Sequence, residues 1–491
     1  MKEWTRDERY RELTRDAEAD LEQLHSEISR SRWRCDYHVQ TVTGLMGDTN
    51  GFSWFNGRWH LFYQWFPYGP VHGLKHWYHV SGRDLIHWEN EGVALIPQGY
   101  MENKGAFSGS GYAEGDTLYL PYTGNHRDED WTRTPYQLLA KMDRDGHIVK
   151  QKEMLYGPVP GYTEHQRDPK LFKYNGMYYF LLGVQNEKKK GCFLLFTSEK
   201  IETGWKLLGE LKVQGYEDFG FMCECPDLER VGDDWLLLFS PQGVAPKQEE
   251  FRNVYQNVYF IGKMDFENLT FIPNGPYKEL DRGFDFYAAQ CAGQTVYEDK
   301  AVMVAWFGVS DYAYPPTCEE GYSGLQTMAR ILSIENGELK QRPPLETEEL
   351  IGETILDATE PCALDEMPAA CIIDVDGNEP FAMRLFARSG EGGLLITWQD
   401  GRFTVERKDL DNQLNVDYGT DRFISMDCFA QARIFVDHSS VEIFINDGDY
   451  VLSARVFPVE EEKGFIYQGK GHAAVRKIIP SVKDDFVIFG K

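Results

Sequence analysis

The stretch from Thr43 to Gln64 reads TGLMGDTNGFSWFNGRWHLFYQ and places one acidic residue, Asp48, directly before a predicted β-hairpin. The turn of that hairpin is Asn56-Gly57, a pair that tolerates positive φ at both central turn positions. Asp48 therefore lies on a tight loop or strand edge, where a single aspartate is most often an Asx-turn residue. Large side chains alternate on both sides of the turn, as strand residues do: Phe52, Trp54, Trp59, Leu61 and Tyr63.

The composition indicates a β-rich protein of two or three domains. The chain has 491 residues and a net charge of −27, which disfavours nucleic acids and anionic membranes as partners. The nine cysteines are odd in number and scattered, a pattern typical of reduced thiols in a cytoplasmic protein. We expect no signal peptide, because the first residues are charged, and no apolar run reaches transmembrane length.

Residues 3–32 are predicted to form one amphipathic helix, because apolar residues recur at steps of three and four among many charged ones. We expect this segment, residues 1–35, to pack against the propeller described next. A short dimer contact along the same apolar face is the alternative, so the expected oligomeric state is monomer or homodimer. The apolar residues of the pattern are Tyr10, Leu13, Ala17, Leu21, Leu24 and Ile28.

From residue 36 onward the sequence changes to β patterns and repeats itself. An apolar run, a glycine-containing turn and an aromatic run recur about every 60 residues, which is the signature of a repeat fold. Units of about four short strands repeated in this way form a β-propeller. Five units fit residues 36–345, so we predict a five-bladed β-propeller there. The turns are Asn56-Gly57, Gly115-Asp116, Asn175-Gly176, Gly232-Asp233 and, more weakly, Glu298-Asp299.

A second all-β domain is predicted after the propeller. Arg342-Pro343-Pro344 and the acidic residues that follow indicate a linker with a short helical turn, over residues 346–359. Beyond it, strand and turn signals recur at the spacing of a β-sandwich. We therefore assign residues 360–491 to a C-terminal β-sandwich, so that the whole fold is all-β with a short N-terminal helix.

Three acidic residues occupy the same place in three of the repeats. Asp48, Asp168 and Glu224 lie seven or eight residues before the turns of the first, third and fourth hairpins. Because residues at one phase of successive blades converge on one face, these side chains are expected to lie close together. Two carboxyl groups flanking a bond are what glycoside hydrolysis needs. The pattern favours a catalytic site over three unrelated turn residues.

The sequence neighbours of two of these acids differ. Glu224 stands between Cys223 and Cys225, and apolar surroundings raise the pKa of a carboxyl group, as a proton donor requires. Asp168 directly follows Arg167, whose guanidinium favours the charged carboxylate. We therefore expect Glu224 to donate the proton and Asp168 to stay charged and bind sugar hydroxyls.

Seven segments carry a wider pattern: LMGDTNG at 45–51, FSGS at 107–110, HQRDPK at 165–170, ECPD at 224–227, SPQG at 240–243, GFDFYA at 283–288 and SSVEIF at 439–444. Along nearly the whole chain they resemble glycoside hydrolase family 32, the group of invertases, sucrose-6-phosphate hydrolases and fructanases. The resemblance implies a five-bladed propeller followed by a β-sandwich. It also implies Asp48 as nucleophile, Glu224 as acid/base and Asp168 as transition-state stabiliser.

The resemblance further implies a fructose pocket lined by five residues and needing no metal or organic cofactor. Judged singly, Trp77 and Phe107 are more often core rings than platforms for a sugar, and the alternative for Gln64 and Ser108 is that they satisfy backbone groups at strand ends. The predicted partner is a small carbohydrate. The five residues are Gln64, Trp77, Phe107, Ser108 and Arg167.

The nucleophile segment departs from the family pattern at three positions. The usual sequence is Trp-Met-Asn-Asp-Pro-Asn-Gly, and here Leu45, Gly47 and Thr49 replace the Trp, the first Asn and the Pro. The Asn normally helps to hold the fructosyl ring and the Trp closes its apolar side. Losing one such contact typically costs about 1 kcal/mol. Either the fructosyl subsite is rebuilt from other residues, or a variant sugar is accepted.

The predicted reaction is retaining hydrolysis of β-fructofuranosides such as sucrose or short fructo-oligosaccharides, with Asp48 and Glu224 carboxyl groups roughly 5–5.5 Å apart. A sucrose-6-phosphate hydrolase is the alternative; Lys188 to Lys190 offer a basic loop, although a solvated loop is favoured. A variant furanosidase, fructosyl transfer and a non-catalytic carbohydrate-binding propeller are the other hypotheses. Retention of all three acids argues against the last.

Overall fold

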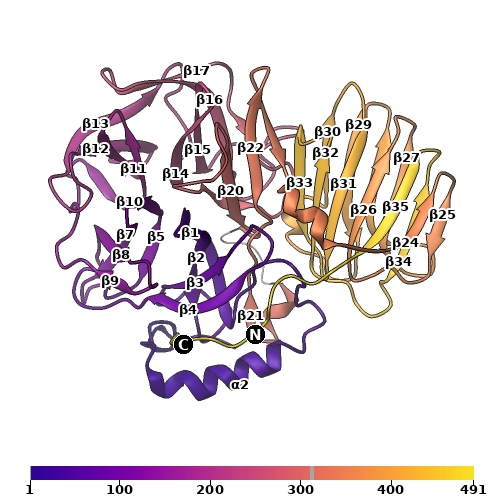
Figure 1. The fold of residues 1–491 in the computed structure, drawn as a ribbon, viewed down its shortest axis with the longest axis horizontal. Coiled ribbons are helices and arrows are strands. Elements are labelled where there is room, and N and C mark those ends of the chain that lie inside the picture. Colours follow the sequence, from indigo (N-terminus) through magenta and orange to yellow (C-terminus); the bar gives the residue numbers. More distant parts are fainter. Residues whose placement is uncertain (1, 310–314, 491) are drawn as a thin grey trace.

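The computed structural model describes residues 2–309 and 315–490. It confirms the predicted fold class, a five-bladed β-propeller followed by a β-sandwich that lies beside it, with helix α2 (Glu18–Ile28) under the propeller (Figure 1). Within the described ranges, no helix combines the length and the apolar character needed to span a membrane.

Five blades form the propeller, and their first strands contact one another in a closed ring. A parallel pair, β13 with β17, joins the third and fourth blades into one sheet. The strands are β1 (Gly44–Phe55), β2 (Arg58–Phe66), β3 (His76–Gly82), β4 (Glu89–Leu95) and β21 (Tyr322–Ser323) in blade 1; β5 (Ala106–Gly109), β6 (Tyr112–Glu114), β7 (Thr117–Arg127), β8 (Arg133–Met142) and β9 (Ile148–Lys150) in blade 2; β10 (Tyr162–Tyr174), β11 (Met177–Asn186), β12 (Gly191–Ser198) and β13 (Lys206–Val213) in blade 3; β14 (Met222–Val231), β15 (Asp234–Gln242), β16 (Val258–Asp265), β17 (Thr270–Pro273) and β18 (Lys278–Glu279) in blade 4; and β19 (Tyr287–Cys291), β20 (Ala301–Trp306), β22 (Arg330–Glu335) and β23 (Glu338–Arg342) in blade 5.

The hairpin turns form where the sequence predicts them. Asn56 and Gly57 connect β1 to β2 with φ of 48° and 78°, and Asn175 and Gly176 connect β10 to β11 with φ of 47° and 81°. Positive φ at both central residues matches the right-handed twist of the paired strands. The fifth connection, from β19 to β20, is a longer loop over residues 292–300, which explains its weak turn signal.

Two six-stranded sheets pack face to face in the sandwich, around a core that includes Ile373, Leu385 and Ile434. The 3-10 turn η4 (Val416–Tyr418) lies between two of its strands. One sheet contains β24 (Ile351–Ala358), β35 (His472–Ile478), β26 (Ala370–Asp376), β31 (Gln431–Asp437), β32 (Ser440–Ile445) and β33 (Tyr450–Arg455). The other contains β25 (Cys362–Leu364), β34 (Gly464–Gln468), β27 (Phe381–Ala387), β28 (Gly393–Gln399), β29 (Arg402–Asp409) and β30 (Asp421–Ser425).

The N-terminal segment is not the single helix that the periodicity of residues 3–32 predicts. It consists of α1 (Arg6–Arg9), the 3-10 turn η1 (Arg15–Ala17) and α2, with extended backbone at Thr14. The helix ends early because the carbonyl of Arg9 accepts a hydrogen bond from Leu74 N at 2.7 Å, a contact with blade 1 that replaces a helical one. Tertiary contacts therefore override the helical pattern.

The predicted linker, residues 346–359, is largely structured. It contains most of the 3-10 helix η3 (Leu345–Leu350) and all of β24, which pairs with β35, so the sandwich sheet begins inside the predicted linker. The chain after β35 leaves the sandwich and returns to the first blade, where Ile488 is buried in the blade's core. On the way this tail passes helix α2, where the Phe486 ring lies 5.6 Å from the His25 ring and the Asp484 carbonyl lies 3.2 Å from His25 Nε2.

A buried ionic network joins the propeller to the sandwich. Arg330 Nη2 lies 2.8 Å from Asp281 Oδ2 and 3.0 Å from Glu442 Oε2. His38 contacts Asp437 Oδ2 at 2.8 Å and Glu442 Oε1 at 3.1 Å. Burial opposes the charged form of His38, but the hydrogen bonds with these two carboxylates raise its pKa to about 9.

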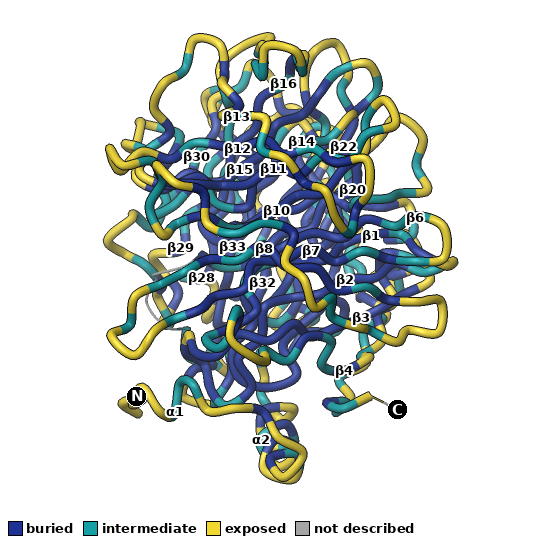
Figure 2. Tube along the Cα trace, turned by 90° about the vertical axis from the view of Figure 1, so that its left-hand side faces the viewer, coloured by how far each residue is buried: buried dark blue, intermediate teal, exposed yellow. Residues whose placement is uncertain are grey.

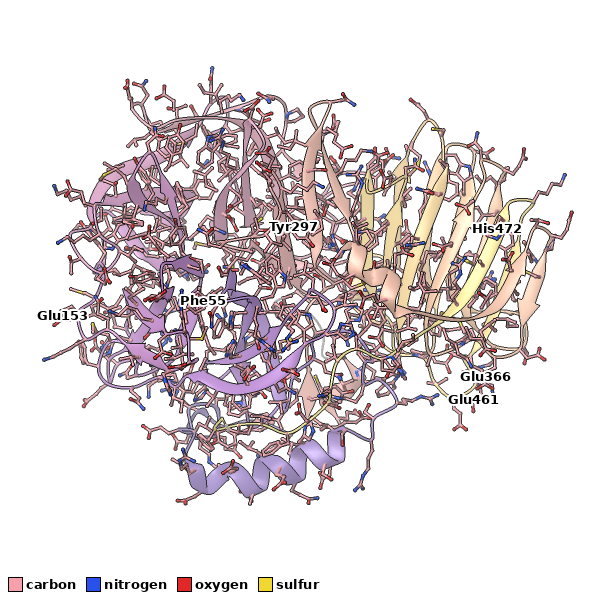
Figure 3. All side chains as sticks on the ribbon, in the orientation of Figure 1. Phe55, Glu153, Tyr297, Glu366, Glu461 and His472 are labelled. Carbon is pink, nitrogen blue, oxygen red and sulfur yellow. The ribbon has the colours of Figure 1, made fainter. Side chains whose placement is uncertain are left out.

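The strands of the ring are buried, whereas the loops at both rims are exposed (Figure 2). Some of the surplus acidic residues lie on the outer surface, for example the exposed Glu153 on the propeller and Glu366 and Glu461 on the sandwich (Figure 3). The negative charge of the chain is therefore not confined to the propeller axis.

Candidate active site

Every first strand of a blade carries a β-bulge at a matched position. Bulges re-aim side chains and are common beside active sites. All three predicted acids lie at such bulges, which is the physical basis of their common phase in the sequence. The interruptions fall between Met46 and Thr49, Ala106 and Gly109, Arg167 and Lys170, Glu224 and Asp227, and Tyr287 and Gln290.

Three of these bulges hold a non-glycine residue in the left-handed region. Asp168 has φ of 69°, Cys225 of 44° and Ala288 of 52°. Such backbone costs of order 1–3 kcal/mol and persists where the surrounding structure imposes it, which is frequently at functional sites. The ring of first strands therefore holds the propeller's acids in a fixed and locally strained frame.

Asp48 is held by a short chain of hydrogen bonds. The hydroxyl of Ser108 donates to Asp48 Oδ2 at 2.5 Å, and Gln64 Nε2 donates to the same hydroxyl at 2.6 Å. Burial and the nearby Glu224 carboxylate raise the pKa of Asp48, and the Ser108 hydrogen bond opposes that rise. Three residues named from the sequence thus form one unit around the predicted nucleophile.

The altered nucleophile segment is anchored by Gln326. Its Nε2 donates to the Gly47 carbonyl at 2.9 Å, and Thr49 Oγ1 donates to its Oε1 at 2.5 Å. Thr49, which stands where the family has proline, therefore adds a side-chain hydrogen bond that proline cannot make.

Glu224 accepts hydrogen bonds on both carboxyl oxygens. Arg167 donates to Oε1 from Nε at 2.9 Å and from Nη2 at 2.7 Å. Gln242 Nε2 donates to Oε2 at 2.9 Å, and the hydroxyl of Tyr287 donates to it at 2.5 Å. These donors fix the orientation of the Glu224 side chain.

The expected environments of Glu224 and Asp168 are wrong in one respect. Arg167 binds Glu224 directly, whereas its Nε lies 4.0 Å from Asp168 Oδ2. Asp168 is buried, and burial together with the Glu224 and Asp48 carboxylates raises its pKa to about 7 despite Arg167. The sequence placed the guanidinium beside the wrong carboxyl because the bulge in β10 turns Arg167 and Asp168 in different directions.

Asp168 is also tied to the neighbouring strands. Its Oδ2 accepts a hydrogen bond from Cys225 N at 2.9 Å, and its own backbone N donates to Thr123 Oγ1 at 3.0 Å. Blades 2, 3 and 4 therefore position this carboxyl jointly.

Trp77 is fully buried and belongs to the core. Its ring packs in the core between blades 1 and 2, and its Nε1 donates to the Phe107 carbonyl at 3.0 Å. Phe107 is half-buried, with the Arg133 guanidinium 5.7 Å from its ring centre. Trp77 thus supports the pocket from behind, and its contact with a sugar stays a prediction.

Two residues that contact Glu224 were not predicted as site residues. Gln242 and Tyr287 lie in the segments 240–243 and 283–288, which the sequence identifies only as framework. The three acids are found by their spacing of seven or eight residues before a hairpin turn. Tyr287 cannot be found in this way, because the long loop 292–300 separates β19 from β20 in the fifth blade.

Three carboxyl side chains brought together by the first strands of a propeller can supply the pair of carboxyl groups that a glycoside hydrolase needs. Residues 38–343 match the glycosyl hydrolases family 32 N-terminal domain, and residues 366–480 match the family 32 C-terminal domain. The chain belongs to glycoside hydrolase family 32, as its motifs predict.

Known relatives extend over almost the entire chain. The sucrose-6-phosphate hydrolase of Staphylococcus xylosus is 37% identical over 478 residues, covering 94% of this chain and 95% of its own. The structure of the sucrose-6-phosphate hydrolase from Lactobacillus gasseri superimposes with a TM-score of 0.92 at 34% identity, over 98% of this chain and 100% of that one. A β-fructofuranosidase from Bombyx mori superimposes with a TM-score of 0.83 at 29% identity, over 96% and 100%.

Proposed function

We propose that this enzyme releases fructose from β-fructofuranosides, sucrose and its 6-phosphate among them, by retaining double displacement. The observation that carries the proposal is the convergence of Asp48, Asp168 and Glu224, since the Glu224 carboxylate lies close enough to raise the pKa of both Asp48 and Asp168. The relatives named as sucrose-6-phosphate hydrolases and β-fructofuranosidase support the substrate class.

In the first step, a carboxylate oxygen of Asp48 attacks C2 of the fructosyl group while Glu224 protonates the leaving glycosidic oxygen. The C2–O bond to the leaving sugar breaks and a fructosyl–Asp48 ester forms. In the second step, Glu224 takes a proton from water, and the resulting hydroxide oxygen displaces Asp48 at C2. Asp168 binds ring hydroxyls throughout. The Asp48–Glu224 separation of roughly 5–5.5 Å stays a prediction.

Phosphorylated sucrose is favoured over plain sucrose by a group of cations near Phe107 and Trp131, which we call the rim cations: Arg9, Lys104, Arg127 and Arg133. The three arginines each have a buried Nε with no hydrogen-bond partner within the described ranges. Burial and repulsion from Arg127 and Arg167 lower the pKa of Arg133 to about 10. Glu164 offsets part of the charge of Arg133, but in a chain with a net charge of −27 a cluster of cations near Phe107 points to an anionic substrate group.

Arg133 links the rim cations to the catalytic site. It lies over Phe107, the neighbour of Ser108, and it is close enough to Arg167 for their repulsion to affect its pKa. Because Arg167 binds Glu224, which protonates the leaving group, a phosphate on the leaving glucose falls on the side of Arg133. The lysine loop at 188–190 is exposed and Lys190 pairs with Asp218, so it is the weaker candidate.

The substrate preference is tested by kcat/KM on sucrose and on sucrose 6-phosphate for the wild type, Arg133→Met and the control Arg144→Met. Arg144 is exposed on the far side of blade 2 and pairs with Asp116. We expect Arg133→Met to lose about 10- to 100-fold on the phosphorylated substrate, as for a charged hydrogen bond, with a much smaller loss on sucrose. Equal losses on both substrates would contradict the assignment.

We further propose a cytoplasmic location and a monomer or homodimer. All nine cysteines are free thiols, and most are buried, as expected in a reducing compartment. Fractionation of the source cells and light scattering of the purified enzyme test these two points.

A further inference from the structure

Lys75 is a buried ammonium without a hydrogen-bond partner. It precedes β3 and is 5% exposed, and its Nζ has no hydrogen-bond partner within residues 2–309 and 315–490. Its carbonyl accepts from Ala106 N at 2.9 Å, so its backbone is fixed between blades 1 and 2. An unpaired buried charge is costly, and such groups are rare unless they serve a ligand.

The ammonium lies beside the nucleophile segment. A Cβ built on Gly47 would lie 3.6 Å from Lys75 Nζ and 3.7 Å from Gln64 Oε1, so Nζ reaches the space next to Gly47. The neighbouring Asp48 attracts this charge, and burial is nevertheless strong enough to lower the pKa of Lys75 to about 8. Lys75 in turn is the main cause that lowers the pKa of His72 to about 3.

This position is where the family pattern has its Asn side chain. With Gly47 the amide is absent, and the nearest polar donor is the ammonium of Lys75, which approaches the same space from blade 1. Resting on the function proposed above, we infer that Lys75 binds the fructosyl ring and supplies the hydrogen-bond donor that the nucleophile segment lacks at Gly47.

Lys75 would allow the enzyme to keep its fructosyl subsite although the nucleophile segment has Gly47 in place of the Asn. An ammonium offers three donors, so one can face the Asp48 carboxylate while another meets a ring hydroxyl. The ammonium of Lys75 and the side chain of an Asn at position 47 would then occupy the same space, because a side chain that extends beyond Cβ on residue 47 contacts Lys75 Nζ. The two positions are therefore expected to be strongly coupled in mutagenesis.

The test is a double-mutant cycle of Gly47→Asn, Lys75→Met and the double variant, measured as kcat/KM on sucrose. The φ of Gly47 is not in the left-handed region, and a Cβ there makes only ordinary contacts, so asparagine is compatible with the backbone. We expect each single change to lower kcat/KM about 10- to 100-fold and the double variant to recover at least about tenfold over either single one. The inference would be overturned if kcat/KM of Lys75→Met stayed within twofold of the wild type, or if kcat/KM did not recover in the double variant.

Thermal unfolding separates binding from support of the fold. Removing an unpaired buried charge is expected to raise the Tm of Lys75→Met, whereas the control Lys150→Met, which loses its contacts with Glu102 and the Ile96 carbonyl, is expected to lower it. Addition of fructose should stabilise the wild type more than Lys75→Met. A fall in Tm for Lys75→Met with an unchanged fructose shift would assign Lys75 to the fold instead. Wild-type turnover of sucrose tests the proposed function separately, and the fructose shift needs no turnover.

Discussion

Replacing Ser108 with alanine removes the only hydrogen bond to the Asp48 carboxyl group found within the described ranges. That bond is 2.5 Å long and donates to a carboxyl group whose pKa is already raised by burial and by Glu224. A hydrogen bond to a charged group contributes about 1.5–3 kcal/mol, and 1.36 kcal/mol corresponds to one pKa unit. The Asp48 pKa is therefore expected to rise by about 1–2 units in Ser108→Ala.

The direction in which the pH dependence of activity shifts follows from the role of Asp48 as nucleophile. The carboxylate form attacks, so activity is lost as the pH falls through the Asp48 pKa, and a higher pKa moves this loss to higher pH. The assay is the pH dependence of kcat/KM, which reports groups of the free enzyme. The acidic limb of Ser108→Ala should move upward by about 1–2 pH units relative to the wild type.

Ser198→Ala is a matched control, because it removes a buried hydroxyl that donates to the Thr203 carbonyl at 2.6 Å in blade 3, away from the site. Its pH profile should coincide with that of the wild type. An acidic limb that stays in place in Ser108→Ala, with both variants folded, would refute the reasoning about Asp48.

Three further outcomes are expected. Arg167→Lys cannot reproduce the two directed contacts with Glu224, so kcat/KM should fall about 10- to 100-fold with little change in Tm, and unchanged kinetics would contradict the orienting role. His38 has a folded pKa of about 9, above its unfolded value of 6.5. Its contribution to the free energy of unfolding is therefore complete below pH 6.5 and is lost as the pH rises through 9. The wild-type Tm should fall between these pH values, and the fall should be smaller in His38→Gln. Deleting residues 481–491 removes the burial of Ile488 and should cost at least about 1.5–3 kcal/mol in denaturant unfolding, whereas an unchanged midpoint would show that the tail is dispensable.

The sequence predicts the architecture because its signals are local and repeated. Turns such as Asn56-Gly57 require a particular backbone, and the acids recur at one phase because each first strand has a bulge at a matched point. The sequence misses the break in the helix predicted over residues 3–32 and the strand β24 in the predicted linker for the opposite reason. The Arg9 carbonyl accepts a hydrogen bond from blade 1, and β24 pairs with β35. Neither contact between distant segments produces a periodic pattern in the sequence.

The sequence names the acids and some of their partners, such as Ser108 beside Asp48, but it does not show which partner binds which acid. Arg167 is the sequence neighbour of Asp168 but binds Glu224, because the bulge in β10 points the two side chains in different directions. Adjacency in the sequence therefore does not identify the partner of Arg167. Lys75 gives no signal of its own, because a lysine before a strand is unremarkable until its ammonium is found buried beside Gly47. Such relations depend on packing between blades.

The central claim, that Asp48 forms a covalent fructosyl intermediate, is tested most directly by incubating sucrose with the wild type and with Asp48→Ala in the presence of methanol. The wild type should release fructose and also form methyl β-fructofuranoside, with retained configuration, while Asp48→Ala should lose at least about 10³-fold of both products. Formation of the α-anomer, or near wild-type turnover by Asp48→Ala, would contradict the account.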